Sequence, residues 1–265
     1  MQNRKIVCID SDGCAMDTMN YKHMYCFGPI AAKVFEVENT EKFLEIWNNV
    51  NLFSKTRGVN RFKALYLVFE KINKPLEEVK KWVENSSELS NDALKKEIKK
   101  NKNDQLQKAL IWSIQVNEEI ESMKKLAKPF SNVRECINKI GEYVDLAVVS
   151  AANNEAIKDE WTKFKLIDSI DYVMGQNEGT KKECIKSLID MGYNPKNILM
   201  IGDSPGDIKA AKENNTLVYP IIVNDEVNSW EYFTKVILDK FLNDEYDDSS
   251  YIKIYEEKLG ELCQE

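Results

Sequence analysis

The sequence predicts an α/β protein with a Rossmann-like parallel sheet, an inserted all-α domain and a helical C-terminal extension. Two observations lead to this prediction. After residue 130, short apolar runs that are typical of buried strands alternate with helical stretches of about ten residues. Between residues 19 and 129, strand signals are sparse and apolar residues recur at helical spacing. A parallel sheet interrupted by a helical insert accounts for both patterns.

The predicted strands follow from their β-branched, apolar composition. The first covers residues 5–9 and ends at Asp10. The later strands are predicted at 144–149, 172–174, 198–201 and 217–223, and the helices between them at 133–141, 153–164, 180–191 and 206–214. Because strands alternate with helices, we expect the sheet to be parallel and covered on both faces.

The insert and the tail are predicted to be helical. Within the insert, Phe62, Leu65, Tyr66 and Phe69 fall on one face of a helix. The tail has two helical patterns, 227–241 and 251–262, which an acidic turn separates. The predicted domains are therefore a core of residues 1–18 and 130–223, a helical domain of residues 19–129, and an extension of residues 224–265 that packs on the core.

Composition excludes several classes of protein. Of 265 residues, 43% are hydrophobic and 31% charged, which is inconsistent with a disordered or collagen-like chain. There is no apolar run of about 18 residues, and the first apolar segment is too short for a signal peptide. We therefore expect a cytoplasmic protein with no membrane partner.

Cysteine spacing predicts neither a zinc site nor a disulfide framework, because there is no CxxC pair. We expect buried, reduced thiols at Cys8, Cys14, Cys26, Cys136, Cys184 and Cys263.

The charge is unevenly distributed along the chain. The net charge of −7 argues against a nucleic-acid partner. Residues 19–129 hold 20 Lys and Arg against 15 Asp and Glu, whereas the rest of the chain holds 17 against 29. One part suited to anions and another suited to cations would fit this division, although a solvated lysine-rich surface is the simpler explanation for most of these lysines.

Carboxylates follow the predicted strands at the sheet edge where ligands bind in open parallel sheets. Asp10 and Asp12 follow the first strand, Ser150 follows the second, and Asp203 and Asp207 follow the fourth. Four crowded carboxylates repel one another, so a hard divalent cation, with Mg²⁺ the leading candidate, would compensate them. Taken alone, Asp207 also fits a helix N-cap.

These motifs resemble those of the haloacid dehalogenase superfamily, in particular its magnesium-dependent phosphatases with a helical cap inserted after the first motif. The resemblance rests on Asp-Ser-Asp-Gly-Cys-Ala-Met-Asp-Thr at 10–18, Val-Val-Ser at 148–150 and Gly-Asp-Ser-Pro-Gly-Asp at 202–207. It implies the fold of this superfamily. Since the family's dehalogenases lack a second aspartate in the first motif, Asp12 favours phosphoryl transfer.

The resemblance implies a two-step reaction through a phosphoaspartate. Asp10 would be the nucleophile, and Asp12 the general acid and base. Ser150 would hydrogen-bond a phosphoryl oxygen, and the adjacent Ala151 is expected at the same group. Mg²⁺ would be held by the Asp10 carboxylate, the backbone carbonyl of Asp12 and the Asp203 side chain. Asp207 would act on the ion directly or through water.

The resemblance also implies a lysine at the start of the helix after the third strand. Lys181 is favoured over Lys182, because an aliphatic helix position lies four residues after it. No proline follows this lysine, which departs from a common pattern of the family. Cys14 is a second departure, and we expect it to have little effect.

Substrate specificity in this family resides in the cap, where the resemblance is weakest. We expect hinges at 17–20 and 128–129 and a loop at 51–61 from which Arg57 or Arg61 reaches a second anionic group of the substrate. Both arginines could instead lie on the surface or pair with cap glutamates. His23 is a further candidate for substrate binding, with a structural role as the alternative.

The function predicted from the sequence is magnesium-dependent hydrolysis of a small phosphorylated metabolite. A phosphomutase with the same core is the first alternative, and a non-catalytic binding or regulatory module is less favoured. Lys22 or Lys33 leaves room for a Schiff-base phosphonatase. The expected partner is a small phosphorylated substrate, with no nucleic acid or membrane, and the expected state is a monomer or homodimer.

Overall fold

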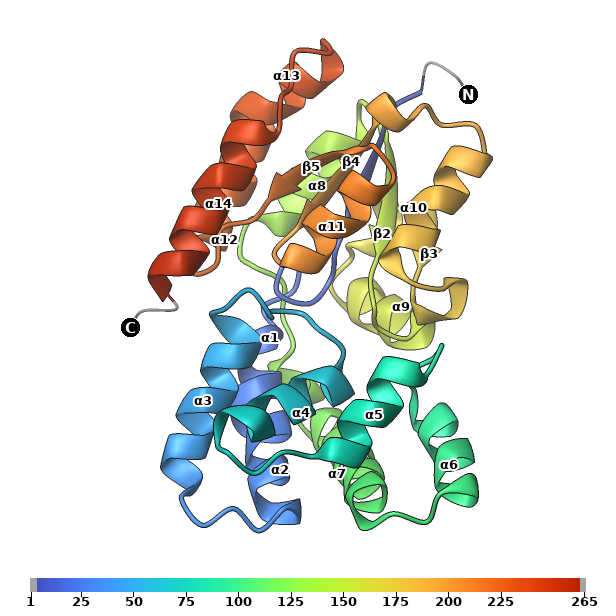
Figure 1. Cartoon of the computed structure of the whole chain (residues 1–265). Coiled ribbons are helices and arrows are strands. Elements are labelled where there is room, and N and C mark those ends of the chain that lie inside the picture. The colour runs from blue at the N-terminus through green and yellow to red at the C-terminus, as the bar shows by residue number, and fades with distance from the viewer. Residues whose placement is uncertain (1–3, 263–265) are drawn as a thin grey trace. The chain divides into compact units, whose positions relative to one another are not determined.

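The computed structural model describes residues 4–262. The chain, coloured by residue number in Figure 1, divides into two compact units. The first unit, called the core unit here, contains Met1–Thr18 and Ala127–Glu265. The second, called the cap unit, contains Met19–Leu126.

A five-stranded parallel sheet forms the centre of the core unit. Its strands are β1 (Ile6–Ile9), β2 (Asp145–Val149), β3 (Tyr172–Met174), β4 (Ile198–Gly202) and β5 (Leu217–Pro220). They lie in the order β3-β2-β1-β4-β5, with every neighbouring pair parallel. The predicted α/β fold with a parallel sheet is therefore confirmed. The fifth strand is shorter than predicted and ends at Pro220, although Ile221 is also buried.

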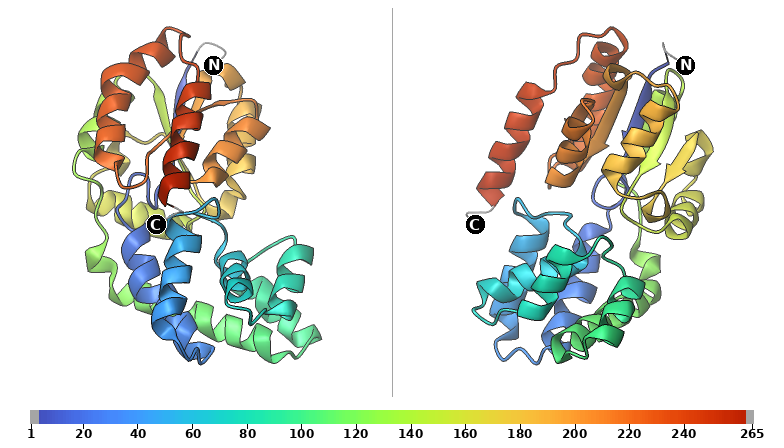
Figure 2. Two further views of the ribbon diagram at one scale, coloured as in Figure 1. Left: turned by 60° about the vertical axis from the view of Figure 1, so that its left-hand side comes forward. Right: turned by 45° about the vertical axis from the view of Figure 1, so that its right-hand side comes forward.

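Helices cover both faces of the sheet (Figure 2). They are α8 (Val133–Gly141), α9 (Asn154–Lys163), α10 (Lys181–Asp190) and α11 (Pro205–Glu213), and the connections contain the short 3₁₀ turns η3 (Ile167–Ser169), η4 (Gln176–Glu178) and η5 (Pro195–Asn197). Alternate strand residues such as Ile6 and Cys8 share a core with Cys184 and Leu188 of α10. All four residues of β1 are fully buried, because the central strand has a helical layer on each side.

The C-terminal extension packs on the edge strand β5. It comprises α12 (Glu226–Tyr232), η6 (Phe233–Ile237), α13 (Leu238–Leu242) and α14 (Ser249–Leu262). The predicted helix at 227–241 thus contains a π-helical turn, η6. At the open edge of β5, the Val218 N–H donates to Asp248 Oδ2 over 3.0 Å and the Val218 carbonyl accepts from the Tyr246 hydroxyl over 2.8 Å. These side chains occupy backbone N–H and carbonyl groups that would otherwise be free to pair with another strand.

Every regular element of the cap unit is a helix. Its elements are α1 (Met19–Tyr21), η1 (Lys22–Phe27), α2 (Gly28–Val34), α3 (Thr40–Leu52), α4 (Arg61–Lys71), α5 (Glu77–Asn85), α6 (Asn91–Lys100), α7 (Asp104–Ser122) and η2 (Lys124–Leu126). Its core is aromatic: Trp112 stacks edge-on against Trp47 and Phe62, with ring centroids 5.9 and 6.1 Å apart. The cap unit therefore has a hydrophobic core of its own.

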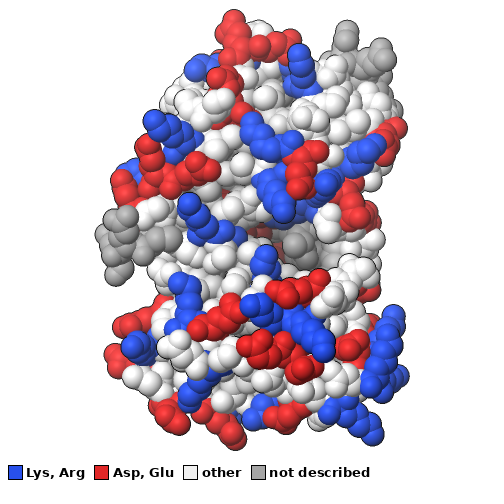
Figure 3. All heavy atoms as spheres, viewed as in Figure 1, with Lys and Arg blue, Asp and Glu red and all other residues white. Residues whose placement is uncertain are grey.

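Positive and negative side chains are interspersed on the face of the molecule drawn in Figure 3. Several cap lysines have acidic neighbours, such as Lys80 with Glu70 at 2.6 Å and Lys95 with Asp92 at 2.8 Å. On this face the lysine-rich insert therefore presents a solvated surface with charges of both signs, which agrees with the simpler explanation of its lysine content.

The two segments that lead to and from the cap unit are joined within the core unit. The Asp17 N–H donates to the Lys128 carbonyl over 2.8 Å, and Met16 forms an antiparallel bridge with Pro129. The side chains of Asp17 and Lys128 also form an ion pair at 3.6 Å. The predicted hinge segments are thus paired, and Asp17 serves this connection.

Five cysteines lie within the described residues, and each of them is a buried free thiol. Cys263, for which a buried thiol is also predicted, lies outside the described residues. Among the helices of residues 4–262, none is both long enough and apolar enough to cross a membrane.

Candidate functional site

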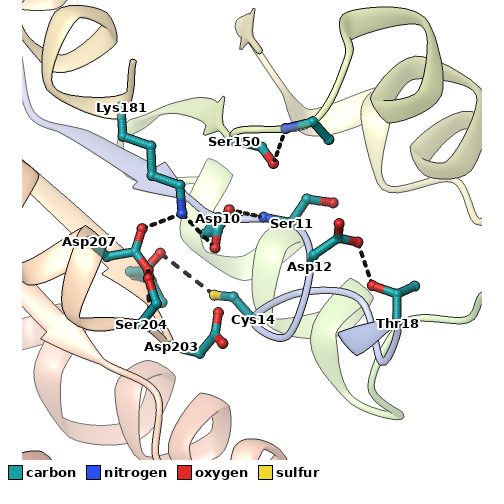
Figure 4. A network of polar contacts seen from close by, with 12 residues as sticks. Asp10, Ser11, Asp12, Cys14, Thr18, Ser150, Lys181, Asp203, Ser204 and Asp207 are labelled. Atoms are coloured by element: carbon teal, nitrogen blue, oxygen red, sulfur yellow. Dashed lines mark hydrogen bonds and ion pairs between the residues drawn. The ribbon is translucent and has the colours of Figure 1, made fainter. Parts of the chain in front are cut away.

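The parallel register of the sheet brings the predicted site residues to one edge. β1 lies between β2 and β4, and Ile9 is in register with Val148 and Ile201. The residues that follow the strand ends therefore emerge together, as the close view in Figure 4 shows for Asp10, Ser150 and Asp203. A hydrogen bond of 3.0 Å from the Asp10 N–H to the Ile201 carbonyl continues the ladder to this edge.

Lys181 connects two carboxylates from different loops. Its Nζ lies 2.8 Å from Oδ2 of Asp10 and 2.6 Å from Oδ1 of Asp207. Lys182 instead pairs with Glu213 at 3.2 Å and has a side chain that is 55% exposed. Of the two lysines considered from the sequence, Lys181 is the one that the structure brings to the aspartates.

The three aspartates of this edge form a compact buried group. Asp10, Asp203 and Asp207 each offer a carboxylate oxygen, and these oxygens lie within 4.8 Å of one another. Burial raises the pKa of the Asp10 carboxyl well above its usual value. The Lys181 ammonium opposes this rise, whereas the Asp207 and Asp203 carboxylates add to it. Lys181 therefore opposes the effect that burial and the two neighbouring carboxylates have on the pKa of Asp10.

The same carboxylates raise the pKa of Lys181. Burial works against the charged ammonium, but the attraction of Asp10 and Asp207 and their hydrogen bonds outweigh it. Lys181 is therefore a fixed positive charge over the whole working pH range of a protein.

Asp207 is held in place by the start of helix α11. The N-cap of α11 is Ser204 rather than Asp207, and the two form a capping box. Oδ2 of Asp207 accepts hydrogen bonds from the backbone N–H and the hydroxyl of Ser204 at 3.0 and 2.7 Å, which leaves Oδ1 for Lys181. The alternative of Asp207 as the N-cap is thus wrong by three positions. Gly202 allows the close approach, since a Cβ there would lie 2.3 Å from Cγ of Asp207.

Asp12 lies beside this group on the loop that follows β1. Its Oδ1 accepts a hydrogen bond of 2.5 Å from the Thr18 hydroxyl, which Figure 4 shows on the side of the loop away from Lys181. Gly13 follows with a φ of 83°, a conformation that favours glycine, and its N–H donates to the Met16 carbonyl. This turn places Asp12 beside the buried carboxylate group, which consists of Asp10, Asp203 and Asp207.

Ser150 and Ala151 lie in the loop after β2. Ser150 is buried, its N–H donates to the Met174 carbonyl, and its hydroxyl accepts from the Ala152 N–H at 3.3 Å. Ala151 is exposed. Contact of either residue with a phosphoryl group stays a prediction.

The substrate-binding candidates of the cap unit have partners within that unit. Nη1 of Arg57 donates to the Leu52 carbonyl over 2.9 Å. Arg61 is the first residue of α4, and its guanidinium donates to the hydroxyl of Ser113 over 3.1 Å and lies over the Phe27 ring. These contacts hold both arginines against groups of their own unit.

The histidine of the cap unit is likewise packed among aromatic residues. His23 stacks on Phe27 with a centroid distance of 4.8 Å, and its Nδ1 accepts from the Trp47 indole over 3.3 Å. Substrate contact by His23, Arg57 or Arg61 is not needed to explain their positions and stays a prediction.

Three aromatic side chains that the sequence did not single out hold the site loops. The Trp161 indole donates to the Ser11 hydroxyl, the Trp230 indole to the Cys14 carbonyl, and the Tyr255 hydroxyl to the Asp203 carbonyl, each over 2.9 Å. No local pattern indicates these long-range contacts. In contrast, the capping box of Ser204 and Asp207 has a local sequence signal, a serine followed by an acidic residue three positions later.

The donor set fits a hard divalent cation. Three buried carboxylates face a single ammonium, so the group has excess negative charge when all members are ionised. Carboxylate oxygens are the protein ligands that Mg²⁺ prefers. The side chains that meet this requirement are Asp10, Asp203 and Asp207, whereas the predicted contribution of Asp12 is through its backbone.

Comparison with known proteins identifies the family. The model of the haloacid dehalogenase-like hydrolase family matches residues 58–220. The chain belongs to this hydrolase family. The matched segment of this haloacid dehalogenase-like hydrolase contains Ser150, Lys181, Asp203 and Asp207, whereas Asp10 and Asp12 precede it and the C-terminal extension follows it. No curated protein matches the chain in sequence.

Solved structures of low sequence identity share the fold. A haloacid dehalogenase-like hydrolase from Streptococcus pneumoniae is 15% identical, with a TM-score of 0.50 over 85% of this chain and 90% of its own. A predicted phosphoglycolate phosphatase from Haemophilus somnus is 16% identical, with a TM-score of 0.54 over 84% and 87%. A predicted phosphatase from Clostridium acetobutylicum is 16% identical, with a TM-score of 0.51 over 89% and 99%.

Proposed function

We propose that this protein is a magnesium-dependent phosphatase that cleaves a small phosphorylated metabolite through an aspartyl-phosphate. The observation that carries the proposal is the position of Lys181 between Asp10 and Asp207, with Asp203 completing a buried acidic group. Structural relatives that are described as predicted phosphatases support the same class of reaction.

The proposed cation would be held by Asp10, Asp203 and Asp207, with the backbone carbonyl of Asp12 as a further ligand. Bound there, a divalent cation would offset the repulsion among these carboxylates and polarise the phosphoryl oxygens.

In the first step, a carboxylate oxygen of Asp10 forms a bond to phosphorus as the bond to the leaving oxygen breaks. Asp12 gives its proton to that oxygen, so the alcohol leaves neutral. In the second step, Asp12 takes a proton from water as the water oxygen attacks phosphorus, which regenerates the Asp10 carboxylate and releases phosphate. Lys181 and Ser150 stabilise the charge that develops on the phosphoryl oxygens.

The two chemical roles of the aspartates match their surroundings. Asp10 is buried beside Lys181, whose ammonium favours the ionised nucleophile. Asp12 is partly exposed and accepts a hydrogen bond from the Thr18 hydroxyl. A helical cap over the site would favour small substrates. For the reaction itself, no observation favours the phosphomutase over the hydrolase.

Phosphate release from a panel of phosphorylated sugars, nucleotides and small acids tests this function. We expect turnover that requires magnesium in the wild type, and a loss of at least about 10³-fold in Asp10→Asn. Asp190→Asn is the matched control, because Asp190 is an exposed residue at the end of α10 that forms an ion pair with Lys186. Equal activity of wild type and Asp10→Asn would rule out Asp10 as the nucleophile.

A trapping experiment tests the intermediate directly. With an activated leaving group such as p-nitrophenolate, the first step needs little acid catalysis, whereas the second still needs a base. Asp12→Asn should therefore accumulate a phosphoryl adduct on the peptide that contains Asp10, detectable by mass spectrometry after acid quenching. An adduct on another residue, or isomerised substrate in place of free phosphate, would contradict the proposed reaction.

A further inference from the structure

The C-terminal extension reaches the two loops that carry the acidic group. From α12, the Trp230 indole donates to the Cys14 carbonyl in the loop after β1. From α14, the Tyr255 hydroxyl donates to the carbonyl of Asp203 itself, immediately after β4. Both side chains are almost fully buried, with 0% and 2% exposure. Neither Trp230 nor Tyr255 lies in the segment that matches the family model, which ends at residue 220.

The loops held by these contacts determine the separation of the carboxylates. Asp203 and Asp10 follow adjacent strands, and each carboxylate lies within 4.8 Å of the other. The loop after Asp10 folds back on itself, and Cys14 also donates its thiol to the Ile201 carbonyl at 3.6 Å. A buried backbone carbonyl that loses its donor has a strong tendency to move toward another one. Such a movement at Cys14 or Asp203 would change the spacing of the cation ligands.

The extension is anchored independently of these two contacts. Asp248, at the start of α14, forms an ion pair with Lys212 at 2.7 Å and accepts the Val218 N–H. Tyr246 donates to the Val218 carbonyl at 2.8 Å. These contacts fix one end of α14 on β5, while Tyr255 lies further along the helix at the site. Loss of the Tyr255 hydroxyl would therefore act on the Asp203 loop without releasing the extension.

We propose that Tyr255 and Trp230 are positioning residues that set the cation affinity of the acidic site. The inference rests on the proposed function, because it takes the acidic group as the magnesium site. Mg²⁺ requires near-ideal octahedral geometry and tolerates little change in ligand spacing. Groups that hold metal ligands in place typically contribute about 10- to 100-fold to metal affinity. The same loss is expected when the hydroxyl of Tyr255 is removed.

The experiment is a calorimetric titration of MgCl₂ into the full chain, using wild type, Tyr255→Phe and Tyr246→Phe. Tyr246→Phe is the matched control, because it also removes a buried hydroxyl that donates to a backbone carbonyl of the core, but at β5. We expect the Mg²⁺ dissociation constant to rise about 10- to 100-fold in Tyr255→Phe and to stay within about two-fold in Tyr246→Phe. Urea unfolding should give the two variants similar losses of stability.

The possible results are distinguishable. If the wild type does not bind Mg²⁺, the proposed magnesium site fails and this inference fails with it. If the wild type binds and Tyr255→Phe binds equally well, the inference alone is overturned. Equal weakening in both tyrosine variants would mean a general structural effect, which also overturns it. If Tyr255→Phe does not fold, Trp230→Phe makes the same test through the Cys14 loop, with the same expected weakening.

Discussion

Replacement of Gly202 by alanine should disable the site through a single methyl group. Gly202 is the last residue of β4, and a Cβ built on it would lie 2.3 Å from Cγ and 2.5 Å from Oδ2 of Asp207. Carbon atoms in contact normally stay about 3.5 Å apart, so the Asp207 carboxylate would have to move by roughly 1 Å. It cannot do so while keeping its bonds to Ser204 and Lys181.

The size of the effect follows from this displacement. Misplacement of a catalytic group by about 1 Å costs on the order of 10²-fold in rate. Overpacking of a well-packed interior costs about 1–3 kcal/mol in the free energy of unfolding. We therefore expect Gly202→Ala to fold, with kcat lowered about 100-fold, weaker Mg²⁺ binding and a moderate loss of stability.

The assay combines steady-state phosphate release, Mg²⁺ titration and urea unfolding. Gly260→Ala is the control, because Gly260 lies in α14 and a Cβ added there would meet no atom within 4 Å outside its chain neighbours and the nearby backbone of the helix. Alanine there should leave activity unchanged and stabilise the helix by up to about 1 kcal/mol. Wild-type kcat and Mg²⁺ affinity in Gly202→Ala would refute the reasoning, since Asp207 would then not need the position that the structure gives it.

Three further predictions concern other parts of the chain. Lys181→Met leaves buried carboxylates without their ammonium, so it should destabilise the metal-free protein by about 3 kcal/mol and gain more stability from added Mg²⁺ than wild type. Lys182→Met, at an exposed position, should change the free energy of unfolding in urea by under about 0.5 kcal/mol. Arg61→Ala should lower the unfolding free energy in urea by about 1–3 kcal/mol, whereas unchanged stability with a raised KM would indicate substrate contact instead. Burial raises the pKa of the Cys26 and Cys184 thiols to about 11, so the folded state holds these protons more tightly than the unfolded state. The resulting stability is complete below about pH 9 and is lost as the pH rises toward 11; urea unfolding across this range should show a shallower decline in Cys184→Ala.

The sheet and its helices could be predicted because their signals are local. The helix at Val133–Gly141 has the predicted bounds, and the other core helices differ by a residue or so at their ends. The last strand was predicted too long, because Ile221 and Val223 are buried without belonging to the ladder. Apolar sequence indicates burial, and only pairing makes a strand.

The residues at the strand ends could be predicted for a related reason. Parallel strands end at one edge of the sheet, so Asp10, Ser150 and Asp203 are neighbours as soon as the strand order is fixed. The cap candidates are different, because an arginine in a loop has no pattern that tells whether it faces a ligand or its own domain. Arg57 and Arg61 donate to groups of the cap unit, and sequence spacing contains no sign of this.

The contacts that hold the loops of the acidic group are the hardest feature to predict from the sequence. Trp230 donates to a carbonyl 216 residues away, and Tyr255 to one 52 residues away. A tryptophan on the apolar face of a helix and a tyrosine in a C-terminal helix look like ordinary core residues, and both are indeed buried. Their polar ends matter because a buried indole N–H or phenol O–H needs an acceptor, and the loop carbonyls beside the carboxylates supply one. The same burial that stabilises the extension therefore also holds the carbonyls of the two loops that carry Asp10 and Asp203.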